Sequence, residues 1–122
     1  MAKNTTPLED EECRAFVEYL EAKRWRFTHI PNEGKFPVQY RVKLRDLGLR
    51  GGIADYVITH PVGLIFIEMK RTKGSRTSQN QLDWREALNK YPNIQSYICY
   101  GCDQAIHVLE SLSNNKDLTR FF

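Results

Sequence analysis

The sequence lacks any long hydrophobic run. Its longest apolar stretch, residues 62–67, is interrupted by Gly63 and is far shorter than the ~20 residues that a transmembrane helix needs. Residues 1–7 contain one lysine and no apolar core, which is unlike a signal or transit peptide. We therefore expect no membrane segment and a cytoplasmic, intracellular location.

Cysteine is scarce and the net charge is small. Three cysteines, an odd number in a chain of 122 residues that is long enough to bury a core without disulfides, indicate free thiols in a reducing compartment. A net charge of +3 does not by itself point to a nucleic-acid partner. The composition, 41% hydrophobic and 27% charged, excludes disordered, collagen-like and coiled-coil classes. One globular domain over residues 1–122 is expected.

The N-terminal part of the sequence predicts an amphipathic helix. Thr6 is suited to the N-cap, Pro7 to the first helical position and Glu9 to a capping box, so the helix should run to about Arg24. The apolar residues at helical spacing are Cys13, Phe16, Val17 and Leu20. A short strand over 25–30 and a turn over 31–34 should follow. Residues 35–52 show no clear period and predict a loop, or a weakly marked helix over 40–47.

The centre of the sequence predicts an antiparallel hairpin. Residues 53–59 and 64–70 are rich in β-branched and aromatic residues, and the intervening 60–63 has Pro and Gly where a type I turn prefers them. If the turn is centred between residues 61 and 62, residues whose numbers sum to 123 lie opposite each other. Asp55 then faces Glu68, and Lys70 shares the face of Glu68 because side chains alternate along a strand.

The C-terminal part predicts a helix, a strand and a second helix. Ser78 is a suitable N-cap for a helix over 79–91, whose inward side includes Gln81. A strand over 95–100 and a helix over 103–112 complete the chain. The predicted order is α-β-β-β-α-β-α, an α/β fold with a mixed sheet flanked by helices.

The facing carboxylates predict a metal site. Two carboxylates at this separation raise each other's pKa unless a cation lies between them, and hard oxygen ligands suit Mg²⁺ or Mn²⁺. Lys70 beside such an ion could orient an attacking water or hold a phosphate oxygen, as metal-assisted phosphodiester hydrolysis requires. The alternative is that Asp55, Glu68 and Lys70 form a surface ion-pair cluster.

The charges are strongly polarised along the chain. Residues 35–76 hold nine basic residues against three acidic ones, whereas the remainder holds nine against twelve. The nine are Lys35, Arg41, Lys43, Arg45, Arg50, Lys70, Arg71, Lys73 and Arg76. All except Lys70 are candidate contacts to a DNA backbone, which lysine and arginine bind without reading sequence. Solvated basic loops without a partner are the alternative.

Three motifs together resemble the VRR-NUC domain, a branch of the PD-(D/E)xK nuclease superfamily. They are residues 48–56 (GLRGGIADY), 66–71 (FIEMKR) and 78–84 (SQNQLDW), and the resemblance covers a core of about 9–112. The order of Asp, Glu-x-Lys and a Ser-x-x-Gln helix start is its most specific part. The family usually has proline before the Asp, where this chain has Ala54.

The resemblance implies a restriction-endonuclease-like core and Mg²⁺- or Mn²⁺-dependent DNA cleavage. By this likeness Asp55, Glu68 and the Met69 backbone carbonyl are metal ligands, Lys70 is the catalytic lysine, and Gln81 supports the site. The family also places a glutamate of the first helix at the metal. Glu9 matches that position best, although its capping-box role competes, and Glu12 is the reserve.

The resemblance also implies partners and a biological setting. Small stand-alone members are similar to phage or bacterial proteins that form homodimers and cut branched DNA, including four-way (Holliday) junctions, as in DNA repair. No organic cofactor is expected. Two alternatives remain open: a DNA-binding module of the same fold that does not cleave, and a thiol redox protein that uses the C-x-x-C at Cys99 and Cys102.

Overall fold

The computed structural model describes residues 6–31, 36–70 and 76–114, with side chains described from Asp10 onward. In chain order the elements are α1 (Thr6–Lys23), β1 (Phe27–His29), α2 (Val38–Asp46), β2 (Tyr56–His60), β3 (Gly63–Lys70), α3 (Gln79–Asn89), β4 (Ile94–Tyr100) and α4 (Cys102–Asn114). Within these described ranges, no helix combines the length and apolar character needed to cross a bilayer.

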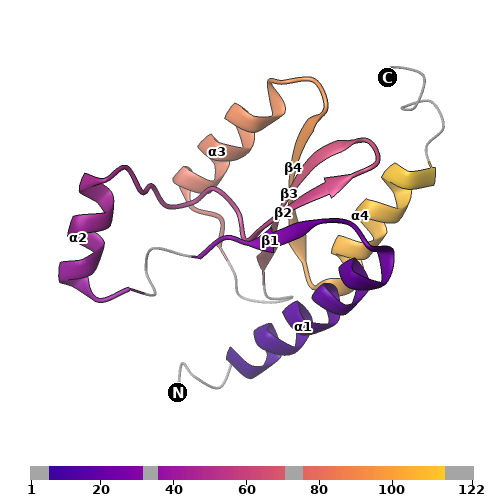
Figure 1. The fold of residues 1–122 in the computed structure, drawn as a ribbon, viewed down its shortest axis with the longest axis horizontal. Coiled ribbons are helices and arrows are strands. Elements are labelled where there is room, and N and C mark those ends of the chain that lie inside the picture. The colour runs from indigo at the N-terminus through magenta and orange to yellow at the C-terminus, as the bar shows by residue number, and fades with distance from the viewer. Residues whose placement is uncertain (1–5, 32–35, 71–75, 115–122) are drawn as a thin grey trace.

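The strands form one mixed sheet in the order β1-β2-β3-β4. The first three strands are antiparallel neighbours, whereas β3 and β4 run parallel and are connected through α3. Helices α1 and α4 lie on one side of this sheet and α3 on the other (Figure 1). The predicted α/β class with a mixed sheet flanked by helices is confirmed, with α2 as an additional helix.

The hydrophobic core fills the space between the sheet and the pair α1 and α4. Phe16 of α1 packs edge-on against Tyr56 of β2, with ring centroids 5.3 Å apart. Alternate residues of the strands point into the same layer and are buried, as the two-residue period of a strand requires. The largest fully buried side chains are Phe16, Leu20, Ile58, Ile65, Ile67, Leu109 and Cys99. Residues of β3 between these buried positions therefore face α3, and Glu68 and Lys70 are among them.

The hairpin has the predicted register. Tyr56 pairs with Ile67, and His60 pairs with Gly63 next to the turn. Gly63 has φ +137°, and a Cβ at this position would lie 2.1 Å from the carbonyl oxygen of Asn93. Glycine is therefore required at the start of β3, where its backbone passes close to Asn93 just before β4. This requirement holds the end of the turn in place, and the turn sets the register of the hairpin.

Helix α2 is the main departure from the predicted order. It extends away from the rest of the molecule (Figure 1) and contains no buried residue. The side chains of Val38 and Val42 are 63% and 64% exposed. A helix that buries no face needs no amphipathic period, which is why residues 35–52 show only a weak helical signal. The other helices begin and end within three residues of the predicted limits.

Candidate active site

Asp55 lies directly before β2 and connects three strands. Its backbone N–H donates to the Ile67 carbonyl at 3.0 Å, and its own carbonyl accepts from the N–H of Ile30 at 2.7 Å. Its side-chain Oδ2 accepts a hydrogen bond of 2.6 Å from the Met69 N–H on β3. The carboxylate is thus held across β3, where the register places it opposite Glu68.

Glu68 has a carboxyl group with a strongly raised pKa. Its side chain is only 14% exposed, and its Oε2 accepts from the Gln81 amide at 2.7 Å. Burial first, and the charge of Asp55 second, raise the pKa of Glu68 to about 7, while the ammonium of Lys70 partly offsets them. In the absence of a cation, the protonated form of Glu68 is therefore favoured up to a much higher pH than for an exposed glutamate.

Lys70 points to the same spot from the next outward position of β3. Its Nζ lies 3.7 Å from Glu68 Oε2 and donates to Gln81 Oε1 and to the Arg76 carbonyl, both at 2.8 Å. Its side chain is 12% exposed. Three contacts therefore fix the ammonium group beside the carboxylates.

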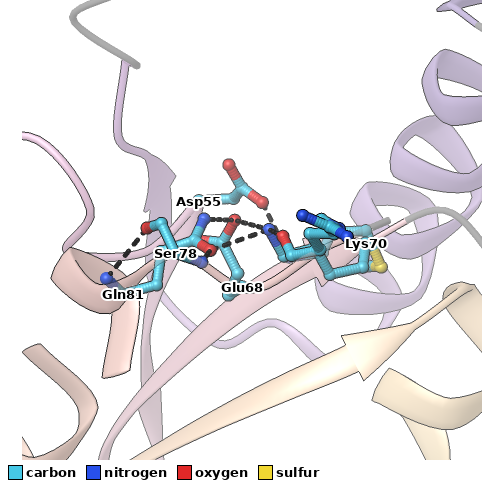
Figure 2. A network of polar contacts seen from close by, with 7 residues as sticks. Asp55, Glu68, Lys70, Ser78 and Gln81 are labelled. Carbon is cyan, nitrogen blue, oxygen red and sulfur yellow. Dashed lines mark hydrogen bonds and ion pairs between the residues drawn. The ribbon is translucent and has the colours of Figure 1, made fainter. Parts of the chain in front are cut away.

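Gln81 connects the other groups (Figure 2). Its Nε2 donates to Glu68, while its Oε1 accepts from Lys70 and, at 2.9 Å, from the backbone N–H of Ser78. The reverse orientation of the amide would place its NH₂ against two donors, so the network fixes the amide orientation. Gln81 N–H in turn donates to Ser78 Oγ at 3.2 Å, which completes a capping box at the start of α3. The helix cap and the site share one side chain.

A cavity of about 200 Å³ opens beside these groups. Asp55 and Glu68 line one part, and Ser78, Asn80 and Gln81 of α3 line another. The remaining lining comes from residues 50–54, between α2 and β2, and from Ile30 and Pro31 after β1. This cavity is large enough for a hydrated cation and a phosphate group. Asp55, Glu68 and Gln81 line it, and Lys70 contacts Glu68 and Gln81 without lining the cavity itself.

The first-helix glutamates are not shown at this site. The Glu9 side chain lies outside the described residues. The Glu12 carboxylate accepts a hydrogen bond from the backbone N–H of Cys102 at the start of α4, so it is engaged there and not with Asp55 or Glu68. Among the described residues, no group of three His, Cys, Asp or Glu side chains gathers that could hold a metal ion. The Met69 carbonyl remains a predicted ligand.

The basic residues are divided between α2 and the edges of the cavity. Arg45 and Lys43 are exposed on α2, and Arg41 is partly exposed there. Arg50 follows α2 and donates to the carbonyls of Arg45 and Leu49 at 3.0 and 2.9 Å. Arg76 is exposed and lies beside Lys70 through its carbonyl. The other predicted DNA contacts, Lys35, Arg71 and Lys73, lie outside the described residues.

Two features of the site are not apparent from the sequence. The carbonyl of Arg76 accepts from Lys70, and backbone carbonyls carry no residue-specific signal. Asn80 lines the cavity one residue before Gln81. Two consecutive glycines at 51 and 52 indicate that another segment can approach the backbone closely there, but they do not indicate that this segment is α3.

The cysteines do not form a redox centre of the expected kind. All three are free, and Cys99 and Cys102 are both buried. Burial raises the pKa of Cys99 to about 12 and that of Cys102 to about 11. Both thiols are therefore protonated at neutral pH, which makes them poor nucleophiles.

Comparisons with known proteins identify the fold. No family model matches the sequence, and no curated protein matches it. A solved structure described as "VRR_NUC domain protein" aligns with TM-score 0.67 and 22% identity over 84% of this chain and 85% of its own. A second, described as "VRR_NUC domain", aligns with TM-score 0.60 and 19% identity over 84% of this chain and 94% of its own. The chain therefore has the VRR-NUC fold that its motifs predict.

Proposed function

We propose that this chain is a divalent-metal-dependent DNA endonuclease that hydrolyses phosphodiester bonds in branched DNA such as four-way junctions. The observation that carries the proposal is that Asp55, Glu68 and Gln81 line one cavity and that Lys70 contacts both Glu68 and Gln81. Two acidic residues, a fixed lysine and a supporting amide from a neighbouring helix form the arrangement that phosphodiester hydrolysis needs. The shared VRR-NUC fold supports it.

The donor groups of the cavity fit Mg²⁺ or Mn²⁺. The raised pKa of Glu68 shows that the site penalises negative charge when no cation is bound. A divalent cation removes this penalty, and carboxylate oxygens are the ligands that both ions prefer. Asp55 and Glu68 would hold it, with the Met69 carbonyl and Glu9 as further candidates. When bound, the ion supplies Lewis-acid stabilisation of charge on the phosphate and lowers the pKa of a bound water.

The protein groups orient the reaction. Lys70, fixed by Gln81 and by the Arg76 carbonyl, is placed to donate a hydrogen bond to the attacking water or to a phosphate oxygen. Gln81 hydrogen-bonds both Glu68 and Lys70, and so helps to hold the two partners of this ion pair in place. Pre-positioning of this kind lowers the reorganisation needed to reach the transition state.

The basic segment is proposed to bind the DNA backbone. The residues concerned are Lys35, Arg41, Lys43, Arg45, Arg50, Arg71, Lys73 and Arg76. Symmetric cleavage of two strands at a junction needs two active sites, and a C₂ homodimer would supply them. Light scattering of the purified protein tests the dimer directly, because a monomeric mass with and without junction DNA would contradict it.

Cleavage of labelled DNA tests the function. Four-way junction, flap, duplex and single-stranded substrates are incubated with Mg²⁺, Mn²⁺ or EDTA. We expect metal-dependent cutting, greatest on the junction, that is lost in Glu68→Ala and Lys70→Ala. Glu86→Ala and Lys90→Ala, which remove exposed residues of the same types at and after α3, serve as matched controls and should cut like the wild type.

Three results would contradict the proposal. Junction cutting that persists in EDTA would exclude the metal. Cutting that survives in Glu68→Ala would exclude the site. Salt-sensitive junction binding without product under any metal would favour a DNA-binding module that does not cleave.

A further inference from the structure

The segment between α2 and β2 contacts the first half of α3 at two points. The indole Nε1 of Trp84 donates to the Gly51 carbonyl at 3.0 Å. Gly52 has φ +93° and lies so close to α3 that a Cβ there would be 2.9 Å from the Cβ of Asn80 and 3.1 Å from its carbonyl carbon. Only glycine allows this approach, both for its backbone angle and for the space available.

These contacts bear on the active site because the contacted part of α3 carries Gln81. Asn80 is its immediate neighbour in the chain, and Gln81 is the residue that links Glu68, Lys70 and Ser78. Helix α3 buries none of its side chains completely. Its first turn is held by the Ser78 capping box and by the Gln81 contacts to β3, so a shift of that turn moves Gln81 relative to β3.

We infer that residues 51 and 52 act as a brace that sets the position of the first turn of α3, and that Gly52 and Trp84 are positioning residues for Gln81. The consequence for catalysis rests on the proposed function, whereas the brace itself is a property of the fold. Gly51 and Gly52 also line the cavity, so the brace fixes part of the cavity wall as well.

Gly48 provides a matched control in the same connection. It has φ +112°, so a side chain there meets the same kind of backbone strain as at Gly52. A Cβ at Gly48 would, however, have no atom within 4 Å. The comparison of Gly48→Ala with Gly52→Ala therefore separates strain in the connection from displacement of α3.

Kinetics of the two variants test the catalytic consequence. We expect Gly52→Ala to lower kcat for DNA cleavage by about 10- to 100-fold, the loss typical of misplacing a catalytic group by roughly 1 Å, with KM for DNA within about threefold. Gly48→Ala should keep kcat within about twofold. Trp84→Phe, which keeps an aromatic ring but removes the N–H donor, should give a smaller fall in kcat in the same direction.

A second substitution at Asn80 tests whether Gly52→Ala lowers kcat through its clash with α3 or through backbone strain at residue 52. Asn80→Gly removes the Cβ nearest to the added methyl group, so the double variant Gly52→Ala/Asn80→Gly should recover part of the kcat lost in Gly52→Ala, measured against Asn80→Gly alone. The strain at residue 52 is unchanged in the double variant. No recovery, or an equal loss in Gly48→Ala and Gly52→Ala, would overturn the brace.

Hydrogen exchange of the metal-free full chain tests the brace without any cleavage. The backbone amides of Gln81 and Leu82 bond to Ser78, at 3.2 Å to its Oγ and 3.1 Å to its carbonyl. We expect both amides to exchange at least tenfold faster in Gly52→Ala, and faster in Trp84→Phe, than in the wild type or Gly48→Ala. Unchanged exchange would overturn the brace even if the protein cleaves DNA. If the wild type never cuts DNA, the proposed function is contradicted, but hydrogen exchange still decides whether residues 51 and 52 brace α3.

Discussion

Replacing Glu68 by glutamine tests the electrostatic cost of the carboxylate pair. Glutamine has nearly the shape of protonated glutamate but cannot ionise. It therefore keeps an acceptor for the Gln81 amide and removes the negative charge that lies buried beside Asp55. In the metal-free protein the substitution should stabilise the fold at alkaline pH, although it removes a residue proposed to be essential for activity.

The magnitude follows from the pKa shift. The pKa of Glu68 rises from 4.5 to about 7 in the folded protein, mainly because of burial. The folded state then binds more protons than the unfolded state between these values, so the free energy of unfolding falls as the pH rises from 4.5 to about 7. At about 1.4 kcal/mol per pKa unit, the loss is about 3 kcal/mol above pH 7. Glu68→Gln avoids this loss. Its free energy of unfolding should therefore exceed that of the wild type by up to about 3 kcal/mol at pH 8.5 and equal it at pH 4.

Urea unfolding in EDTA at both pH values measures the difference. Titrating groups that do not interact with Glu68 are common to both proteins and cancel in the comparison. Glu86→Gln, an exposed glutamate on α3, is the matched control and should differ from the wild type by less than about 0.5 kcal/mol at either pH. Adding Mn²⁺ at pH 8.5 should stabilise the wild type more than Glu68→Gln. Equal stability of the wild type and Glu68→Gln at pH 8.5 in EDTA would refute the reasoning.

Three further predictions concern other parts of the molecule. Gly63→Ala should destabilise the fold by more than about 3 kcal/mol in urea unfolding, because its Cβ would lie 2.1 Å from the Asn93 carbonyl oxygen, and a loss below about 1 kcal/mol would contradict this packing. His60 is buried among backbone and Ser113 contacts, and burial lowers its pKa. The buried, neutral form of His60 therefore stabilises the fold above pH 6.5, and this stability is lost as the pH falls. In urea unfolding, His60→Gln should show a smaller fall in the free energy of unfolding between pH 7.5 and pH 5 than the wild type. A substitution at the exposed His107 should leave that fall unchanged. Replacing the three basic residues of α2 with alanine should lower the salt dependence of DNA binding by up to about 2.7 in the slope of log K against log salt, as measured by fluorescence anisotropy, and an unchanged slope would exclude α2 from the DNA interface. These three are Arg41, Lys43 and Arg45.

Features of the fold that depend on local sequence could be predicted. The hairpin register follows from a turn whose Pro and Gly positions are diagnostic, and it places Asp55 opposite Glu68. The start of α3 follows from the Ser78 and Gln81 capping box. In both cases the residues that decide the structure are neighbours in the sequence, so their chemistry is sufficient.

Features that depend on contacts between distant segments could not be predicted. Helix α2 buries no face, so its periodic signal is weak and the sequence predicted a helix over 40–47 only as an alternative to a loop. The hydrogen bond from the Cys102 N–H to Glu12 joins residues ninety positions apart. It occupies the Glu12 carboxylate away from the site, although Glu12 was a candidate metal ligand. The approach of Gly52 to Asn80 likewise exists only after α3 has packed on the sheet.

The most direct test of the central claim is the location of Mn²⁺ in crystals of the full chain, measured by anomalous diffraction. The account predicts an anomalous peak within the cavity that Asp55, Glu68 and Gln81 line, with both carboxylates as ligands. At saturating Mn²⁺, a peak elsewhere with both carboxylates unliganded would contradict it.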